Sequence, residues 1–278
     1  MRIAIIHSYY GSGVPSGENT SVDAQYAALT AAGHTVLLLS RNTDLESGLS
    51  AYPARAAFRV LTGRGPDPSQ RLAAFEPDVV HVHNLFPNIG SRWLESWDGP
   101  IVHTLHNFRP LCANGLLFRE GATCTLCPDG KPAAAIRHGC YHDSVVASVP
   151  LAIRNSRGLG SNPLFERSDA LIVLSQQARD IYATYGVSPE RMSVIPNGLP
   201  RFEGNRDPAP MFPRWLGVGR LSEEKGFKEL VEIWPRNVPL DIFGDGPQRA
   251  EIADTAPTSV RLAGSVARDA VRASMSGY

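Results

Sequence analysis

The sequence predicts an α/β protein with two domains, each built on a parallel sheet. Three observations support this prediction. Apolar runs of strand length alternate with segments of helical periodicity along most of the 278 residues. A proline-rich stretch interrupts the alternation once, after which it resumes. Hydrophobic residues make up 43% and charged residues 19% of the chain, which is typical of a globular protein with a sizeable core.

The first domain is expected over residues 1–195. It opens with RIAIIHS, residues 2–8, a run typical of a strand buried on both faces. Residues 16–34 then place Val22, Tyr26 and Leu29 at helical spacing. Further strand-length runs occupy residues 35–40, 77–83, 100–106 and 169–175. Strands alternating with helices predict βαβ units and a parallel sheet covered on both faces.

A linker is expected at residues 196–210, because five prolines fall between Pro196 and Pro213. The second domain is expected over residues 211–278. Its expected strands are 214–220, 239–244 and 259–264, and its expected helices are 225–234, 247–254 and 267–275. Three strand–helix units are few for a doubly wound domain, so we expect this domain to be incomplete.

Charge and hydropathy exclude several classes of protein. Lys plus Arg and Asp plus Glu number 27 each, so the overall balance gives no sign of a nucleic-acid partner. The apolar run at the N-terminus is too short for a signal peptide. No stretch approaches the roughly 18–20 apolar residues of a membrane span. The sequence therefore predicts a cytoplasmic protein.

A glycine-rich loop, GSGVPSGEN, follows the first predicted strand at residues 11–19. Gly13 and Gly17 would let backbone N–H groups at the start of the next helix approach a phosphate or a sugar. The glycine spacing is one residue longer than the dinucleotide fingerprint, and no acidic residue ends the second strand, which disfavours an NAD site. The alternative is a flexible loop whose glycines only permit tight turns.

Two motifs stand at the ligand-binding edge of the second predicted sheet. In VGRLSEEKG, residues 218–226, Arg220 and Lys225 would suit a diphosphate. Lys225 is expected at a helix start, where a cation opposes the helix dipole, so a bound anion would explain its presence there. The alternative is two surface cations. In DIFGDGPQ, residues 241–248, Gly244, Asp245 and Gly246 would allow close approach to a nucleobase, or would only form a tight turn.

Histidines gather at two predicted strands of the first domain. In VHTLHNFRP, alternation sends Thr104 and His106 to one face of the strand and His103 to the other. His106, at the strand end, is the better functional candidate, and a histidine inside a strand is more often a core residue. His81 and His83 on the neighbouring strand are weaker candidates for ligand contact.

Four cysteines fall within 29 residues, at Cys112, Cys124, Cys127 and Cys140. In a cytoplasmic protein this clustering favours a four-cysteine structural zinc site, in which His138 or His142 would replace a ligand if needed. Unligated thiols are the second alternative, and disulfides or redox chemistry the third. We expect these residues to lie in a cysteine-rich insertion at 107–147.

The motifs SGEN, DVVHVHN, HTLHN, VIPNGL, GRLSEEKG and FGDGP occur in this order along the chain. Their order and spacing resemble the retaining nucleotide-sugar glycosyltransferases of family 4, and the resemblance covers essentially the whole length. It implies the GT-B fold, in which two Rossmann-like, doubly wound domains face each other across a cleft.

The resemblance implies transfer of a hexose from a UDP-, GDP- or ADP-linked donor to a carbohydrate or lipid-linked acceptor, with retention of anomeric configuration. Candidate catalytic residues are His106, Arg220 and Lys225. Arg220 and Lys225 match the pair that binds the donor diphosphate, and His106 matches the histidine beside the reacting sugar. The remaining matches are donor-binding: Gly13, Gly17 and Glu18 in the first loop, and Gly244, Asp245 and Gly246 in the base-side turn. No catalytic metal is expected, and a lipid-linked acceptor would bring the enzyme to the inner face of a membrane.

The resemblance is not complete. The family's Glu-x7-Glu stretch does not occur, because the sequence stops in the helix that usually precedes it, so we expect a fragment. Two alternatives therefore stay open. One is a sugar-nucleotide-binding remnant without turnover, and the other is a different GT-B enzyme such as a nucleotide-sugar epimerase, against which the Arg220–Lys225 pair and the SGEN loop weigh.

Overall fold

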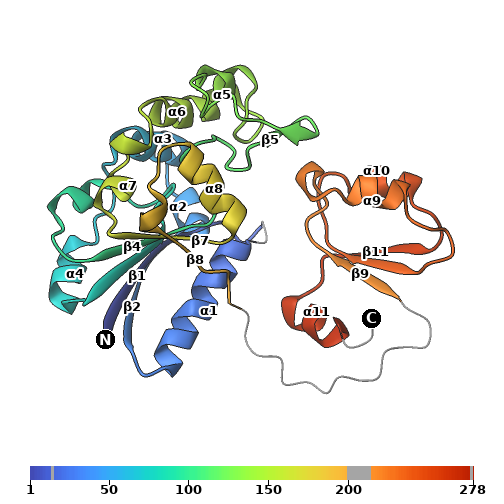
Figure 1. The fold of residues 1–278 in the computed structure, drawn as a ribbon, viewed down its shortest axis with the longest axis horizontal. Helices are drawn as coiled ribbons and strands as arrows, with labels where there is room; N and C mark the ends of the chain where they lie inside the picture. The colour runs from blue at the N-terminus through green and yellow to red at the C-terminus, as the bar shows by residue number, and fades with distance from the viewer. Residues whose placement is uncertain (14–15, 199–213, 276–277) are drawn as a thin grey trace. The chain divides into compact units, whose positions relative to one another are not determined.

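The computed structural model describes residues 1–13, 16–198, 214–275 and 278. The chain divides into two compact units (Figure 1). Unit 1 comprises Met1–Leu117 and Cys124–Pro200, and unit 2 comprises Phe118–Thr123 and Arg201–Tyr278. Most of the predicted linker, from residue 199 onward, lies outside the described residues.

Unit 1 contains a six-stranded parallel sheet, as the sequence predicts. Its strands are β1 (Arg2–Tyr9), β2 (Thr35–Asn42), β3 (Val79–Asn84), β4 (Ile101–Leu105), β7 (Ala170–Val173) and β8 (Met192–Val194). They lie in the order β2-β1-β3-β4-β7-β8, and every neighbouring pair is parallel. The chain leaves β1 toward β2 on one side and later returns to β3 on the other, so the strand order reverses between β1 and β3.

Apolar residues on both faces of β1 explain why this sheet is covered twice. Ala4 and Ile6 pack into one core cluster with Leu72, whereas Ile3 and Ile5 pack into another with Val22. Because successive side chains of a strand point to opposite faces, the continuous apolar run requires helices on both sides. Helix α1, which carries Val22, runs along the sheet (Figure 1).

The helices of unit 1 connect these strands. They are α1 (Gly17–Ala31), α2 (Thr43–Ser47), α3 (Tyr52–Thr62), α4 (Ser69–Phe75), α5 (Ala133–Arg137), α6 (Val145–Ser156), α7 (Pro163–Arg167) and α8 (Gln176–Thr184). Short 3₁₀ turns occupy Arg92–Ser96, Leu159–Ser161 and Pro189–Arg191. Helix α1 begins where it does because the Ser16 hydroxyl accepts a hydrogen bond from the Asn19 N–H at 3.2 Å.

The cysteine-rich stretch follows β4 and has little regular structure. It contains α5 and the antiparallel pair β5 (Phe118–Arg119) and β6 (Ala122–Thr123). Ala135 of α5 packs with Leu151 and Ala152 of α6, and Cys127 and Cys140 lie against this cluster half-buried.

Unit 2 contains a three-stranded parallel sheet in the order β11-β10-β9. Besides the β5–β6 pair, its described elements are β9 (Trp215–Val218), a 3₁₀ turn (Glu223–Lys225), α9 (Phe227–Glu232), β10 (Leu240–Phe243), α10 (Arg249–Thr255), β11 (Val260–Gly264) and α11 (Arg268–Ser274). A core of Leu221, Phe227, Val231, Leu240, Ile242 and Ile252 holds them together. The predicted strand–helix alternation is therefore confirmed in both units.

Candidate active site

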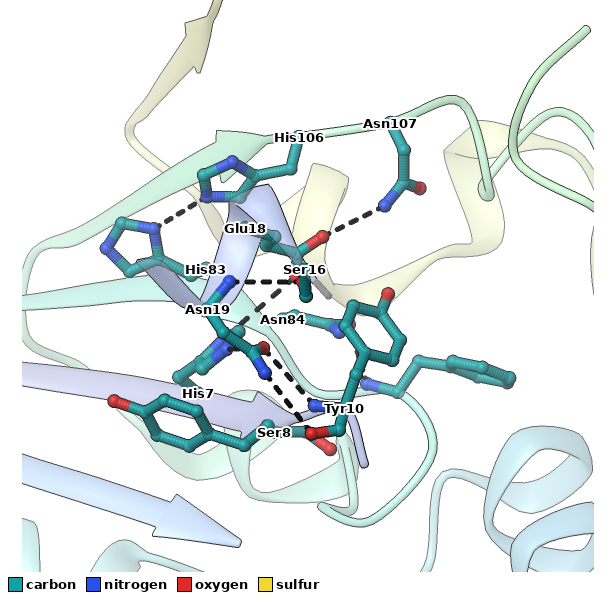
Figure 2. A network of polar contacts seen from close by, with 12 residues as sticks. His7, Ser8, Tyr10, Ser16, Glu18, Asn19, His83, Asn84, His106 and Asn107 are labelled. Atoms are coloured by element: carbon teal, nitrogen blue, oxygen red, sulfur yellow. Dashed lines mark hydrogen bonds and ion pairs between the residues drawn. The ribbon is translucent and has the colours of Figure 1, made fainter. Parts of the chain in front are cut away.

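The carboxyl ends of β1, β3 and β4 carry a group of polar side chains at the reversal of strand order (Figure 2). His7 lies near the end of β1, His83 near the end of β3, and His106 directly after β4. Open α/β sheets bind ligands at this edge and at this kind of switch point. The first turn of α1 adds Glu18 to the same group.

A hydrogen bond joins two histidines of neighbouring strands. His83 Nδ1 and His106 Nε2 are 2.8 Å apart, and the two rings are stacked with centroids 5.1 Å apart. The ring of His81 also stacks on that of His83, with centroids 4.2 Å apart. Among the described residues, His83 Nε2 and His106 Nδ1 are buried without a hydrogen-bond partner.

These histidines are neutral at physiological pH. Burial lowers the pKa of His7, His81 and His106 to about 4 each. Burial and the neighbouring histidines also hold the pKa of His83 well below its ordinary value of 6.5. In the His83–His106 bond, therefore, one ring donates and the other accepts.

Glu18 is a buried carboxyl group in the same place. Its Oε2 accepts a hydrogen bond from Asn107 Nδ2 at 3.1 Å, and its Oε1 lies 4.0 Å from His7 Nδ1. Burial raises the pKa of Glu18 to about 7, although the nearby Arg109 and the amides of Asn107 and Asn84 lower it. Oε1 has no hydrogen-bond partner within the described part of the chain. Glu18 can therefore hold or release a proton near neutral pH.

Asn19 fixes the tautomer of His7. Its side-chain Oδ1 accepts from the Tyr10 N–H at 3.2 Å, and its Nδ2 donates to the Tyr10 carbonyl at 3.2 Å. These two backbone contacts orient the amide, so His7 Nε2, 3.1 Å from Oδ1, must donate. His7 Nδ1 then carries a lone pair that faces the Glu18 carboxyl group. This lone pair favours the protonated form of Glu18.

A pocket of about 310 Å³ opens onto these groups within unit 1. Its lining includes Glu18, His83, Asn84, His106 and Asn107. A volume near 300 Å³ lies at the lower end of small-molecule sites. Buried polar atoms without protein partners, such as Glu18 Oε1 and His106 Nδ1, are expected to contact a polar ligand.

The predicted cations of unit 2 lie at the carboxyl edge of its own sheet. Arg220 follows β9, and Lys225 ends the 3₁₀ turn rather than beginning the next helix. Both side chains are exposed, and no ion pair occupies either of them among residues 214–275. Two uncompensated cations are thus available to an anion at this edge.

The glycines of the DIFGDGP motif are required by contact between two loops. A Cβ on Gly244 would lie 1.7 Å from the Gly219 carbonyl oxygen, and a Cβ on Gly246 would lie 2.3 Å from the Leu221 oxygen. The Leu221 N–H also donates to the Asp245 carbonyl at 2.9 Å. These glycines therefore let the loop of Asp245 support the loop of Arg220. Asp245 itself is exposed, with Oδ2 3.4 Å from Arg249.

The glycines of the first loop have a different environment. Gly13 lies after β1 and Gly17 is the first residue of α1. A Cβ on either would meet nothing within 4 Å. Open space beside them is compatible with a ligand, but packing does not demand glycine at either position.

The structure brings predicted Glu18 and His106 to one pocket and adds residues that sequence reasoning left out. Asn107 bridges Glu18 and the backbone, because its Oδ1 accepts from the Arg109 N–H at 3.0 Å. His83, a weaker candidate by sequence, pairs directly with His106. A polar residue immediately after a predicted strand end was the signal for Asn107. His103 also lines this pocket, although its side chain is buried with its ring 5.9 Å from that of Phe165.

The predicted zinc site is not supported. All four cysteines lie among the described residues, yet within that part of the chain no group of three or more His, Cys, Asp or Glu side chains could hold a metal ion. No disulfide links Cys112, Cys124, Cys127 and Cys140. Cys112 Sγ instead donates to Asn114 Oδ1 at 3.0 Å, and burial, with the three other cysteines nearby, raises the pKa of Cys127 to about 11. The cysteines that are close in sequence are thus near one another in the fold, but they are not arranged as the ligands of a zinc ion.

Comparison with known proteins identifies the family. The sequence profile of Glycosyltransferase Family 4 matches residues 15–201, about two thirds of the chain. This chain belongs to glycosyltransferase family 4. The family assignment made from the six motifs is thus confirmed.

Individual relatives are more distant. Glycogen synthase of Mycobacterium tuberculosis, from strains CDC 1551 and H37Rv, is 25% identical over 299 aligned positions. The alignment covers 92% of this chain, which spans 64% of the length of that relative. Among solved structures, the apo form of the lipopolysaccharide outer-core galactosyltransferase WaaB matches with a TM-score of 0.51 at 14% identity. The match covers 100% of this chain and 72% of the galactosyltransferase chain, and it confirms the fold class. In the part of the chain that is described, no helix has both the length and the apolar character needed to cross a bilayer.

Proposed function

We propose that this chain belongs to a retaining glycosyltransferase that moves a hexose from a nucleotide sugar to an acceptor hydroxyl. The pocket at the switch point of unit 1 is the observation that carries the proposal. There, a carboxyl group with a pKa near 7 and a neutral histidine pair present unpartnered polar atoms to a cavity. Membership of family 4 supplies the reaction class.

In this proposal Arg220 and Lys225 bind the diphosphate of the donor. The bond between the sugar C1 and the diphosphate oxygen breaks, and negative charge develops on the leaving group. Two exposed, unpaired cations would stabilise that charge without a divalent ion. The acceptor oxygen forms the new bond to C1, and its proton passes to the departing diphosphate oxygen. Retention of configuration follows if attack occurs on the face that the leaving group vacates.

Glu18 and His106 bind and orient sugar hydroxyl groups. The free Oε1 of Glu18 accepts from a hydroxyl, and the free Nδ1 of His106 completes the site. Because His106 is neutral, it does not destabilise the positive charge that develops at C1 by electrostatic repulsion.

Calorimetric titration of the 278-residue chain with UDP, GDP and ADP, and with their glucose conjugates, tests the proposal. Arg220→Ala should weaken binding of the preferred nucleotide about 10- to 150-fold, because a charge-assisted hydrogen bond contributes about 1.5–3 kcal/mol and each factor of ten corresponds to about 1.4 kcal/mol. Arg236→Ala is the matched control, since Arg236 is exposed and lies between α9 and β10, at the opposite edge of the sheet. Nucleotide binding that both variants retain would contradict the assignment. Arg220-dependent binding without sugar transfer to any acceptor would favour the remnant without turnover.

A further inference from the structure

The charged lining of the unit 1 pocket is unbalanced. Its charged residues are Arg59, Arg92, Arg109, Arg154 and Arg157 on one side and Glu18 and Glu95 on the other. Arg59 forms an ion pair with Glu46 at 3.0 Å, outside this lining. Four arginines then face two acids, one of which, Glu18, is partly protonated at neutral pH.

The two inner arginines are held by neutral groups. Arg154 Nη2 donates to the Arg109 carbonyl at 2.8 Å and to Asn155 Oδ1 at 3.0 Å. Arg109 Nη1 donates to the Ala113 carbonyl at 3.1 Å, and its guanidinium lies 4.6 Å from the centre of the Phe86 ring. No carboxylate pairs with either side chain among the described residues of unit 1. Their positions are thus fixed. Arg109 lies close enough to Glu18 to lower the pKa of that carboxyl, but a pKa of about 7 leaves Glu18 only partly ionised at neutral pH.

An anion placed between these arginines would be stabilised by both of them. Burial and the neighbouring Arg109 lower the pKa of Arg154 to about 10, which reflects two like charges held close together away from water. Arg109 Nε is also buried without a hydrogen-bond partner within the described residues. Planar guanidinium groups match carboxylate and phosphate oxygens, so an oxyanion is the ligand that best satisfies both.

The outer end of the pocket carries two further arginines, Arg92 and Arg157. Arg157 follows α6 and donates from Nη1 to the Leu61 carbonyl at 3.0 Å, and the Arg92 backbone N–H donates to the Gly63 carbonyl at 3.1 Å. Both side chains are exposed at the same short segment of chain. Positive charge therefore extends from the rim of the pocket to Arg109, which is two residues from Asn107 and its contact with Glu18.

We propose that the unit 1 pocket binds an acceptor carrying an oxyanion, either a phosphate or a carboxylate, and that Arg109 and Arg154 hold this group. The inference rests on the proposed function, because it takes unit 1 to be the acceptor side. It deepens that function by naming the class of acceptor. An oxyanion at Arg109 leaves the rest of the acceptor near Glu18 and His106, where its hydroxyl would react.

Binding of four probes to the full chain tests this inference without any turnover. Inorganic phosphate, glucose 1-phosphate, glucuronate and glucose are titrated at low and at moderate salt. We expect glucose 1-phosphate or glucuronate to bind at least tenfold more tightly than glucose, with an affinity that falls as salt rises. Which of the two binds more tightly distinguishes a phosphate from a carboxylate. Equal binding of glucose and the charged probes would overturn the inference.

Variants locate the site. Arg109→Gln should weaken binding of the charged probe at least tenfold, Arg109→Lys less, and Arg157→Gln, at the exposed rim, by a smaller factor without affecting the fold. Arg71→Gln is the control, because Arg71 is exposed on α4 and does not line the pocket. Charged-probe binding that is unchanged in both the Arg109→Gln and Arg157→Gln variants would overturn the inference. A circular dichroism melt confirms that each variant is folded.

A competition experiment separates this inference from the proposed function. If the preferred nucleotide displaces glucose 1-phosphate even in the Arg220→Ala variant, the pocket binds the donor diphosphate and the inference is wrong. If nucleotide binding depends on Arg220 while no charged probe binds unit 1, the proposed function stands and the inference fails. Probe binding that depends on Arg109 supports the inference even if the nucleotide experiment fails.

Discussion

Glu18 and Asn107 join the first turn of α1 to the end of β4 through a hydrogen bond of 3.1 Å between Asn107 Nδ2 and Glu18 Oε2. The two residues are 89 positions apart in the sequence. The bond satisfies one carboxyl oxygen and leaves the other, Oε1, buried 4.0 Å from His7 Nδ1 without a hydrogen-bond partner in the described chain. A carboxyl group held in this way is oriented, and its pKa of about 7 leaves it partly protonated at neutral pH.

Glu18 should make the stability of the fold depend on pH. Its pKa rises from 4.5 to about 7 on folding because of burial, so the folded chain binds this proton more tightly than the unfolded chain. The stabilisation is present below about pH 4.5 and is lost as the pH rises through 7. At about 1.4 kcal/mol per pKa unit, the loss is about 3 kcal/mol.

We therefore expect Glu18→Gln to be more stable than the wild type at pH 8 and similar to it at pH 5. Urea unfolding at both pH values measures this difference. Glu76→Gln, at an exposed position of the same unit, is the control. The same pH dependence in wild type and Glu18→Gln would contradict a raised pKa.

The buried histidines should act in the opposite direction at lower pH. Folding lowers the pKa of His7, His81 and His106 from 6.5 to about 4, so the unfolded chain binds more protons between these values. Their contribution to stability is complete above about pH 6.5 and is lost as the pH falls toward 4. His81→Gln should reduce this acid sensitivity. Imidazole NMR signals of these residues that titrate near pH 6.5 in the folded protein would rule out the neutral cluster.

Substitution of Gly246 should disturb the loop that carries Arg220. A Cβ there would lie 2.3 Å from the Leu221 carbonyl oxygen, so the two loops of unit 2 must separate. We expect Gly246→Ala to destabilise the protein by about 1–3 kcal/mol, as overpacking usually does, and to weaken nucleotide binding. Gly160→Ala is the control, since a Cβ at Gly160 meets nothing within 4 Å. Calorimetric melts and the nucleotide titration would detect both effects, and a variant that matches wild type in both would disprove the contact.

Cys127 should react slowly with alkylating agents. A pKa near 11 leaves about a hundredfold less thiolate at pH 8 than the ordinary value of 9, and the greater nucleophilicity of the more basic thiolate offsets part of this difference. We expect iodoacetamide to modify Cys127 about tenfold more slowly than glutathione, as measured by peptide mass spectrometry. Adding a chelator should change nothing. If the chelator accelerates modification of all four cysteines together, they hold a metal after all.

The sequence by itself determined the parallel α/β class, the positions of the main strands and the family. These features follow from local information. The run Ile3–Ile6 has no polar face, which indicates a strand covered on both sides, and alternation of strands with helices favours parallel pairing through helical crossovers. His106 was likewise indicated by its place at a strand end, whereas Glu18 was indicated by the resemblance of the first loop to the family motif.

Only the tertiary structure decided which of these groups meet. His83 pairs with His106 because the register of β3 and β4 sets Val82 beside His103, and strand register does not follow from strand pattern. Five arginines line one pocket although they come from four separate segments of unit 1. The cysteines show the converse, since their zinc-like spacing did not produce a ligand set. Periodicity reports which face of an element is buried, but distances between side chains depend on register and packing between segments far apart in the chain.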